Sequence, residues 1–458
     1  MLFRAFLAIF LTVFGFAQPV VAQADGARPT VGGGWGVTVR TGKAAKPKSS
    51  IPRAATGAAV GVAAGAAAAA KVASVALAEQ SGPVIASNVV LSGDNTRTSL
   101  VVDLTAETAF TTFRMANPNR VIVDLDNVEF RLKEGTGGKG RGLIASYRYG
   151  LFAAGKARIV IDTTGPIRID AARIRQVDGQ QAVHLELDLI PTTATEMAAA
   201  GLANAAQVVA VKPPEPAAAD RPAAEKAKPI IVIDPGHGGI DPGAQGAHGY
   251  EKDLVLAVSR EIRRSLVAAK RYEVVMTRQN DVFVSLDQRV RLSKQLQADL
   301  FLSVHADSLA QRELAQAIRG ATIYTLADKA TDDRARLLAE KENAADVLAG
   351  LDVSNGPNDD QVRHILYDLV RRESANFSND FRSVLVNRLK SKLTLSRDPM
   401  RSGPFKVLRQ PGSPAVLIEL GYMSNAADEK QMAEPAWQRQ IGDAVARAVD
   451  DYFAKRPQ

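Results

Sequence analysis

The feature that most constrains the fold is the run of residues 230–239, which reads IIVIDPGHGG. Its first half is β-branched and typical of a buried strand. The second half cannot continue that strand, because Pro235 has no N–H and the three glycines around His237 have no side chain to pack. His237 is therefore expected at the carboxyl end of a strand, which is where α/β sheets usually keep their ligand sites.

Strand-like and helix-like segments alternate from residue 230 to residue 458. This alternation predicts an α/β domain whose central sheet is largely parallel and flanked by helices. The predicted strands are IIVID, YEVVMTR, LFLSVHAD, GATIYTL, FKVLR and AVLIELGYM. The predicted helices are EKDLVLAVSREIRRSLVAA, SLDQRVRLSKQLQ and EPAWQRQIGDAVARAVDDYFAK, with a long helical region before FKVLR.

The sequence pattern of residues 83–191 differs from that of the α/β region. Short β-rich runs such as LVVDLT, VIVDLD and IVIDTT are separated by turn signals such as ANPNR and GTGGKGRG. Many short strands without a convincing helix predict an all-β sandwich. His184 falls in an alternating strand and is interpreted as structural or exposed. No catalytic group of residues is recognisable here, so this region is predicted to be a binding module.

The remaining segments are not expected to form domains. Residues 1–24 combine a basic start, an apolar run and small residues suited to cleavage after Ala22 or Ala24, which predicts a signal peptide for Sec-type export without a stable membrane span afterwards. Residues 25–82 are basic and then alanine-rich, as in a tether, and residues 192–229 resemble a linker rich in proline and alanine. The absence of cysteine fits a large-cored envelope protein without disulfides.

The net charge of +8 and the sequence pI near 9.5 favour an anionic partner. No zinc finger, aromatic RNA-binding signature or basic helical face is found, so nucleic acid is not expected. An anionic cell-wall polymer or a membrane surface fits the charge equally well.

Four residues of the second region are expected at one rim of the sheet. His237 follows the first strand, Glu251 opens the first helix, His305 lies at the end of LFLSVHAD, and Glu419 lies in AVLIELGYMSN at the carboxyl end of a hydrophobic strand. Two imidazoles and one carboxylate are the usual ligands of a catalytic zinc, and a further carboxylate can act as general base and acid. The glycines beside His237 would let substrate and backbone approach the metal.

Each residue also has a simpler interpretation. Glu251 alone could be an acid favoured at a helix N-terminus, and His305 could be a histidine with ordinary partners. Glu419 is harder to dismiss because an unpaired carboxylate in an apolar strand is costly to bury. His248 competes for the ligand role but lies in a loop without a strand, and His364 is interpreted as a surface or packing residue. The loop DPGHGGIDPG lacks the lysine and hydroxyl of a phosphate-binding loop.

These same segments resemble a known family. IVIDPGHGGIDPGAQG, YEKD, LFLSVHAD and AVLIELGYMSN are similar, in order, to the signature segments of zinc-dependent N-acetylmuramoyl-L-alanine amidases of the AmiC type. By that resemblance His237, Glu251 and His305 would hold Zn²⁺, and Glu419 would be the catalytic carboxylate. FTTFRMANPNRVIVDLDNVEF and GKARIVIDTTGPIRI resemble the AMIN domain, which is associated with envelope targeting and cell-wall binding.

The resemblance implies a peptidoglycan hydrolase that cleaves the amide between N-acetylmuramic acid and L-alanine of the stem peptide. It implies a periplasmic protein, enriched at the division septum, that splits septal wall during cell separation. Two alternatives remain open at this point: a zinc peptidase that cuts within the stem peptide, and a non-catalytic cell-wall-binding envelope protein.

The segment of about residues 328–373 is longer than an ordinary connection and mostly helical in pattern. In division-associated members of the family a helix inserted here occludes the active site. By that likeness the chain is autoinhibited until a divisome activator with a degenerate metallopeptidase-like domain draws the helix away. Glu342 is the first candidate for the residue that blocks the zinc, and Glu340 is the second.

Overall fold

The computed structural model describes residues 82–133, 135–176, 183–205, 228–308, 318–351, 364–410 and 412–455. The predicted signal peptide, nearly all of the predicted tether and most of the predicted linker lie outside these ranges. None of the helices in the described ranges is long and apolar enough to cross a membrane.

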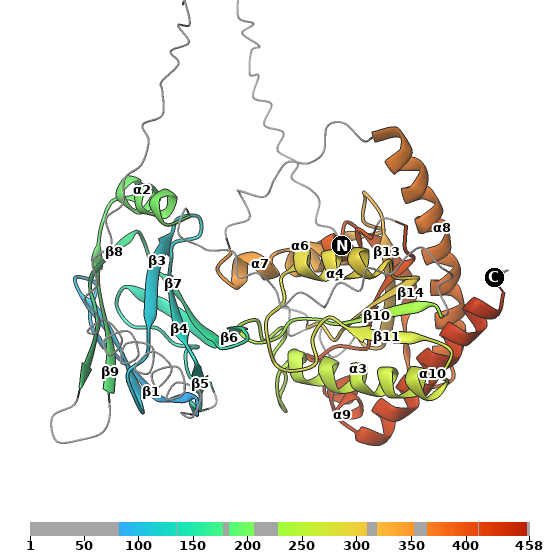
Figure 1. The fold of residues 1–458 in the computed structure, drawn as a ribbon, viewed down its shortest axis with the longest axis horizontal. Coiled ribbons are helices and arrows are strands. Elements are labelled where there is room, and N and C mark those ends of the chain that lie inside the picture. The colour runs from blue at the N-terminus through green and yellow to red at the C-terminus, as the bar shows by residue number, and fades with distance from the viewer. Residues whose placement is uncertain are drawn as a thin grey trace, which may run out of the picture. The chain divides into compact units, whose positions relative to one another are not determined.

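The first part of the described chain is a β-sandwich of two sheets, ordered β5-β1-β2-β9-β8 and β3-β4-β7-β6 (Figure 1). Neighbouring strands are antiparallel except for β1 and β5. Inward residues alternate with outward ones along β2, and side chains such as Leu100 and Val123 from the two sheets share one core. The strands are β1 (Val84–Gly93), β2 (Thr98–Leu104), β3 (Phe110–Met115), β4 (Arg120–Asp126), β5 (Val128–Phe130), β6 (Ile144–Ala153), β7 (Lys156–Thr163), β8 (Ile167–Gln176) and β9 (Val183–Pro191).

The second part is an α/β domain with one six-stranded sheet, ordered β11-β10-β12-β15-β13-β14. The strands β11, β10, β12 and β15 are parallel, whereas β13 is antiparallel to β15 and parallel to β14. The largely parallel sheet of the prediction is therefore confirmed, with a reversed edge. The strands are β10 (Ile230–Pro235), β11 (Glu273–Met276), β12 (Leu300–His305), β13 (Ala321–Leu326), β14 (Leu395–Gly403) and β15 (Ala415–Glu419).

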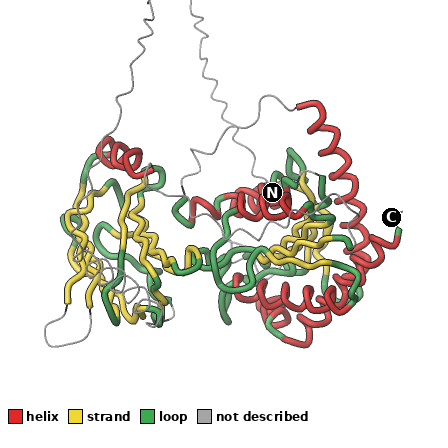
Figure 2. The backbone as a smooth tube through the Cα atoms, viewed as in Figure 1, coloured by secondary structure: helices red, strands yellow, loops and turns green. Residues whose placement is uncertain are grey.

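The central strands of this sheet are buried on both sides, because helices cover both faces of the sheet. Ile231 and Ile233 pack into a core with α3, α8 and α10, while Val232 packs on the other face with α4 and α6. Figure 2 shows the helices around the strands. The helices are α3 (Glu251–Ala268), α4 (Leu286–Leu296), α6 (Asp333–Asn343), α7 (Ala345–Leu348), α8 (His364–Leu389), α9 (Ala426–Met432) and α10 (Pro435–Ala454).

Helix starts follow local capping chemistry. Ser285 and Gln288 form a capping box at α4, and the Asp332 carboxylate accepts from the Ala335 N–H at the start of α6. Asn425 caps α9, and Pro435 occupies the first turn of α10, where its missing N–H costs nothing.

The structure differs from the sequence prediction in three elements. Residues 194–205, assigned above to the linker, form helix α2 (Ala194–Ala205), because Met197 is fully buried in the sandwich core. FKVLR, predicted as a strand, contains the 3₁₀ helix η2 (Lys406–Leu408). Strand β14 was not predicted, because a polar edge strand has no hydrophobic run to reveal it.

The inserted segment is mostly helical where it is described. Helices α6 and α7 and the beginning of α8 fall within residues 328–373, in agreement with the predicted helical pattern. Residues Gln80–Gln458 cluster as one compact unit, which contains both the sandwich and the α/β domain.

Candidate metal centre

His237 leaves the end of β10 with a φ of 56°, in the left-handed region that non-glycine residues rarely adopt. Two buried arginines stabilise this turn through its carbonyl groups. Arg289 donates to the carbonyls of Pro235 and His237 at 2.7 and 2.9 Å, and Arg278 donates to those of Pro235 and Gly236 at 3.0 and 2.7 Å. The side chain of His237 is thereby presented at the rim in one orientation.

Glycine at position 236 is required by a neighbouring ring. A Cβ atom on Gly236 would lie 2.4 to 2.7 Å from three atoms of the His305 imidazole, closer than any real Cβ contact. Residues of β10 and β12 pair in parallel, so the two strand ends meet here. Gly236 therefore lets the two histidines approach each other, with ring centroids 4.9 Å apart.

The tautomer of His237 is indicated by Asp241. Nδ1 of His237 lies 2.9 Å from Oδ2 of Asp241, and both side chains are buried. A proton on Nδ1 donates to this carboxylate and leaves the Nε2 lone pair free. Such a carboxylate behind the imidazole is the usual support of a metal-binding histidine.

Glu251 is fixed by backbone groups at the start of α3. Its Oε2 accepts from the Ala244 N–H and its Oε1 from the Ala306 N–H, each at 2.8 Å. Oε1 also lies 3.1 Å from Nε2 of His237 and 3.3 Å from Nδ1 of His305. The structure thus brings together the three residues that the sequence predicted as metal ligands.

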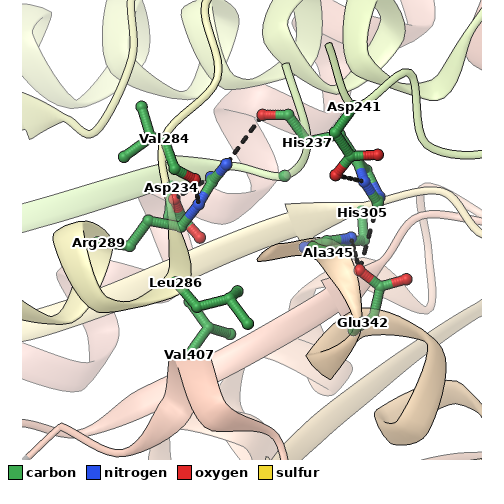
Figure 3. Close-up of a pocket in the computed structure, with 11 residues that line it drawn as sticks. Asp234, His237, Asp241, Val284, Leu286, Arg289, His305, Glu342, Ala345 and Val407 are labelled. Atoms are coloured by element: carbon green, nitrogen blue, oxygen red, sulfur yellow. Dashed lines mark hydrogen bonds and ion pairs between the residues drawn. The ribbon is translucent and has the colours of Figure 1, made fainter. Parts of the chain in front are cut away.

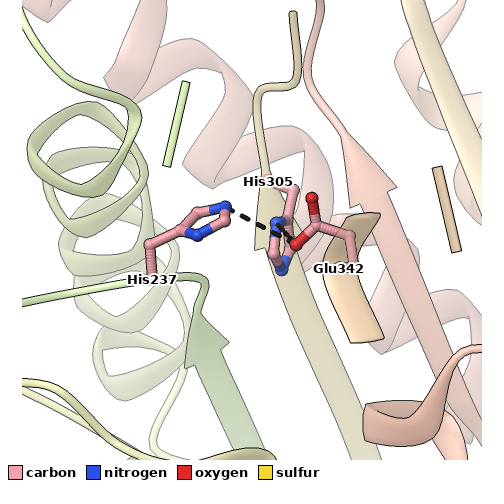
Figure 4. A group of neighbouring side chains, drawn as sticks. All are labelled: His237, His305 and Glu342. Atoms are coloured by element: carbon pink, nitrogen blue, oxygen red, sulfur yellow. Dashed lines mark ion pairs between the residues drawn. The ribbon is translucent and has the colours of Figure 1, made fainter. Parts of the chain in front are cut away.

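Glu342 reaches the same point from helix α6. Its Oε2 lies 3.6 Å from Nε2 of His237 and 3.2 Å from Nδ1 of His305, and the side chain is buried (Figure 4). It forms part of the wall of a pocket beside the histidines (Figure 3). The pocket is lined by Asp234, Gly236, His237, Asp241, Val284, Leu286, Arg289, His305, Glu342, Ala345 and Val407.

This group has the composition and spacing of a metal site. The ligand atoms of His237, His305 and Glu342 lie within 4.8 Å of one another. Nε2 of His237, Nδ1 of His305 and Oε1 of Glu342 are buried and make no hydrogen bond. Four ligands about 2.0–2.1 Å from a tetrahedral zinc would be roughly 3.3 Å apart, and the ion-pair distances of 3.1 to 3.6 Å bracket that value. The residues present therefore fit zinc.

The charged groups of the site lie so close together that they shift one another's pKa values. Burial alone would lower the pKa of His237, but Glu251, Asp241 and Glu342 raise it well above its usual range. Burial alone would raise the pKa of Glu251, yet His237 and His305 hold it well below the usual range. A cation bound here would take the place of the imidazole protons.

Glu419 stands beside this group on the neighbouring strand. It pairs with His305 in the register of β12 and β15, and its Oε2 accepts from the Asp307 N–H at 2.9 Å. Its Oε1 makes no hydrogen bond, and the side chain is fully buried. Burial first, and then the charges of Asp307, Glu251 and Glu342, raise the pKa of Glu419 well above its usual range. A carboxyl group with a raised pKa suits general acid–base chemistry.

Other candidates from the sequence lie away from the centre. The side chain of His248 is 69% exposed, and its Nδ1 lies 3.4 Å from Glu429. His184 pairs with Asp103 on the sandwich, as a structural residue would. Glu340 is on the surface of α6, where it accepts from Arg336 at 2.9 Å, so it does not reach the histidines. The side chain of His364 lies outside the described residues.

Several residues of the centre were missed by the sequence analysis. Asp241, Arg278 and Arg289 orient the His237 turn, and Asp307 forms an ion pair with Lys341 beside Glu342. Asp241 could have been found, since it follows His237 by four residues in the glycine-rich loop. The arginines lie 41 and 52 positions beyond His237, and nothing local in the sequence connects them to it.

Comparisons with known proteins find matches for both described regions of the chain. Residues 231–451 match the family model described as N-acetylmuramoyl-L-alanine amidase, and residues 88–189 match the AMIN domain. The chain is 30% identical over 395 residues to "N-acetylmuramoyl-L-alanine amidase AmiC" of Escherichia coli O6:H1, covering 84% of this chain and 92% of that protein. It is 30% identical to AmiC of Neisseria meningitidis serogroup B over 373 residues, 78% of this chain and 88% of that one.

A solved structure, the catalytic domain of the amidase CwlV from Bacillus (Paenibacillus) polymyxa, is 26% identical with a TM-score of 0.35. The alignment covers 50% of this chain and 99% of that domain.

Proposed function

The chain belongs to the family of AmiC-type N-acetylmuramoyl-L-alanine amidases with an N-terminal AMIN domain. From this premise we propose that it is a zinc enzyme whose activity its own helix α6 keeps at a low basal rate. Its activity is hydrolysis of the amide between N-acetylmuramic acid and L-alanine in peptidoglycan. The observation that carries the proposal is that Nε2 of His237 and Nδ1 of His305 are buried, make no hydrogen bond and face the carboxylates of Glu251 and Glu342.

We assign the resident ligands as His237, His305 and Glu251. The argument for Glu251 over Glu342 is preorganisation. Both oxygens of Glu251 are fixed by backbone N–H groups of the α/β domain, whereas Oε1 of Glu342 makes no hydrogen bond. Glu342 comes from an inserted helix and would occupy the fourth position, which a catalytic zinc site keeps for water or substrate.

Zinc held by these residues supplies Lewis acidity toward the scissile carbonyl and toward water. The chain itself supplies the proton transfers. Glu419, on the same rim and with a raised pKa, takes a proton from water and then delivers it to the departing nitrogen of L-alanine. The Asp307 N–H holds one Glu419 oxygen in place and leaves the other free for this role.

In the proposed inhibited state Glu342 fills the substrate position. Lys341 of the same helix forms an ion pair with Asp307, so two consecutive residues of α6 attach it to the centre. An activator with a degenerate metallopeptidase-like domain would have to draw both residues away. The proposal includes export by a Sec-type signal to the periplasm, enrichment at the septum and a role in cell separation.

Wall digestion tests the reaction and its metal. Purified full-length protein is incubated with isolated peptidoglycan, and the products are identified by mass spectrometry. We expect intact stem peptides freed from glycan, loss of activity after chelation and recovery with zinc. Fragments cut within the stem peptide would instead indicate a peptidase, and activity that survives metal removal would contradict the zinc assignment.

The inhibition is tested with a matched pair of variants on one helix. Glu342→Ala should raise the basal rate of wall hydrolysis, because it removes the carboxylate that faces both histidines. Glu340→Ala, two residues earlier on the exposed face, should leave the rate unchanged. Equal rates for the wild type and Glu342→Ala would refute the autoinhibition.

A further inference from the structure

Three arginines of the sandwich converge on the end of helix α7. Arg120 donates to the carbonyl of Val347, Arg148 to that of Leu348 at 2.9 Å, and Arg158 to those of Ala349 and Gly350 at 3.0 and 3.3 Å. The last carbonyl groups of a helix have no partner within the helix, so they need outside donors. Here the four successive carbonyls of residues 347–350 accept hydrogen bonds from arginines of the sandwich.

The arginines are held in position by acids of their own sandwich. Arg158 binds the Asp124 carboxylate through Nε and one terminal nitrogen, at 2.6 and 2.9 Å, which leaves its other terminal nitrogen for the α7 end. Asp162 binds both Arg120, at 2.5 Å, and Arg148, at 2.8 Å. Each guanidinium therefore uses one side for an aspartate and offers another side to the inserted segment.

Apolar packing accompanies these hydrogen bonds. Ala349 is fully buried in a small cluster with Ile122 and Val160 of the sandwich and with Ile240 and Phe283 of the α/β domain. Gly350 has a φ of +74°, and a Cβ atom there would lie 2.5 Å from Cδ1 of Ile122. A side chain at position 350 would therefore be strained by the positive φ and would also have to displace the end of the Ile122 side chain.

The same sandwich edge also contacts the turn that carries His237. The carbonyl of Leu151 accepts from the Ile240 and Phe283 N–H groups at 3.2 and 3.3 Å. Glu342 and Val347 are five residues apart in two consecutive helices, and Asp346 between them accepts from the Leu286 N–H at 3.0 Å. A restraint on residues 347–350 is therefore also a restraint on Glu342.

We propose that the sheet β3-β4-β7-β6 of the AMIN domain is a docking surface for residues 345–351, and that this contact keeps Glu342 over the histidines. The proposal rests on the autoinhibition proposed above and adds a second role for the AMIN domain. Because coupling is reciprocal, whatever draws α6 away also weakens the docking, and whatever undocks the sandwich favours the open site.

Full-length variants test the docking from both sides. Arg148→Gln removes a donor from the sandwich, and Gly350→Ala disturbs the segment while leaving the sandwich sequence intact. We expect the basal rate of peptidoglycan hydrolysis to rise by about tenfold, the effect of roughly 1.4 kcal/mol. Arg173→Gln, which alters an exposed arginine on strand β8, serves as the control and should leave the rate unchanged.

Hydrogen exchange of residues 345–351, followed by mass spectrometry, gives a readout independent of catalysis. We expect faster exchange in Arg148→Gln and in Gly350→Ala than in the wild type and Arg173→Gln, with unchanged exchange in the sandwich core. Glu342→Ala separates the two proposals. If Glu342→Ala raises the rate but neither docking variant changes rate or exchange, the docking is wrong and autoinhibition stands. If Glu342→Ala has no effect, autoinhibition itself fails.

Discussion

At the scale of single residues, the centre depends on a histidine in a costly backbone conformation. A left-handed φ at a non-glycine residue costs on the order of 1–3 kcal/mol, and His237 keeps it because Arg278 and Arg289 bind the surrounding carbonyls. Gly236 then makes room for the ring of His305. The ligand geometry is thus built by residues that do not themselves offer a ligand atom.

Asp241 provides the test at this scale. Asp241→Ala removes the acceptor that fixes Nδ1–H of His237, so the affinity for zinc should fall about 10–100-fold. Competition with a chromophoric chelator measures this affinity. Asp443→Ala, which changes an exposed carboxylate on α10, should bind zinc as the wild type does. An unchanged affinity in Asp241→Ala would show that the carboxylate does not support the ligand.

At the scale of elements, two short segments, α2 and β14, form because neighbouring parts of the fold offer them a packing or pairing partner. The alanine-rich residues 194–205 bury little area by themselves, yet α2 forms because Met197 enters the sandwich core and Thr193 accepts from the Glu196 N–H. Strand β14 similarly exists because β13 offers a parallel partner for its backbone. Neither element has a hydrophobic pattern strong enough to predict it.

Met197→Ala tests the role of α2. A fully buried methionine replaced by alanine should destabilise the sandwich by about 2–5 kcal/mol. Urea-dependent hydrogen exchange in peptides of the sandwich measures this change separately from the α/β domain. Met400→Ala serves for comparison, because that side chain is 47% exposed and its loss should cost no more than about 0.5 kcal/mol. Equal effects of the two substitutions would mean that α2 is not anchored.

At the scale of the whole molecule, the centre joins parts that are far apart in the chain. The proposed ligands follow β10, end β12 and open α3, the proposed general base ends β15, and the proposed blocking residue comes from α6. The sandwich adds contacts to the His237 turn and to the α7 end. Zinc binding and the contacts of helix α6 with the centre should therefore stabilise the same part of the protein.

Zinc should raise the unfolding temperature of the α/β domain. At a free concentration about 100 times the dissociation constant, binding stabilises the folded state by about 2.7 kcal/mol. For a domain of this size that corresponds to roughly 5–10 °C, measurable by calorimetry. In His305→Ala the shift should be lost. A shift of equal size in that variant would place the stabilising zinc elsewhere.

The sequence by itself determined the two fold classes and brought four residues to one rim. Hydrophobic runs of period two and strand–helix alternation are local signals, and the carboxyl ends of parallel strands necessarily share an edge. His237, Glu251, His305 and Glu419 could therefore be found without a structure. Glu342 needed the family resemblance, because an acid on a charged helix is by itself unremarkable in pattern.

Only the tertiary structure shows which residues hold the rim of the sheet in position and which helix lies over it. Arg289, Arg278 and the arginines of the sandwich act on backbone carbonyls, and a carbonyl acceptor leaves no trace in the sequence. The sequence analysis ranked Glu342 before Glu340, but only the structure shows that Glu342 faces the histidines while Glu340 lies on the exposed side of α6. Contacts between distant segments depend on the packed chain as a whole, and so they could not be derived from local pattern.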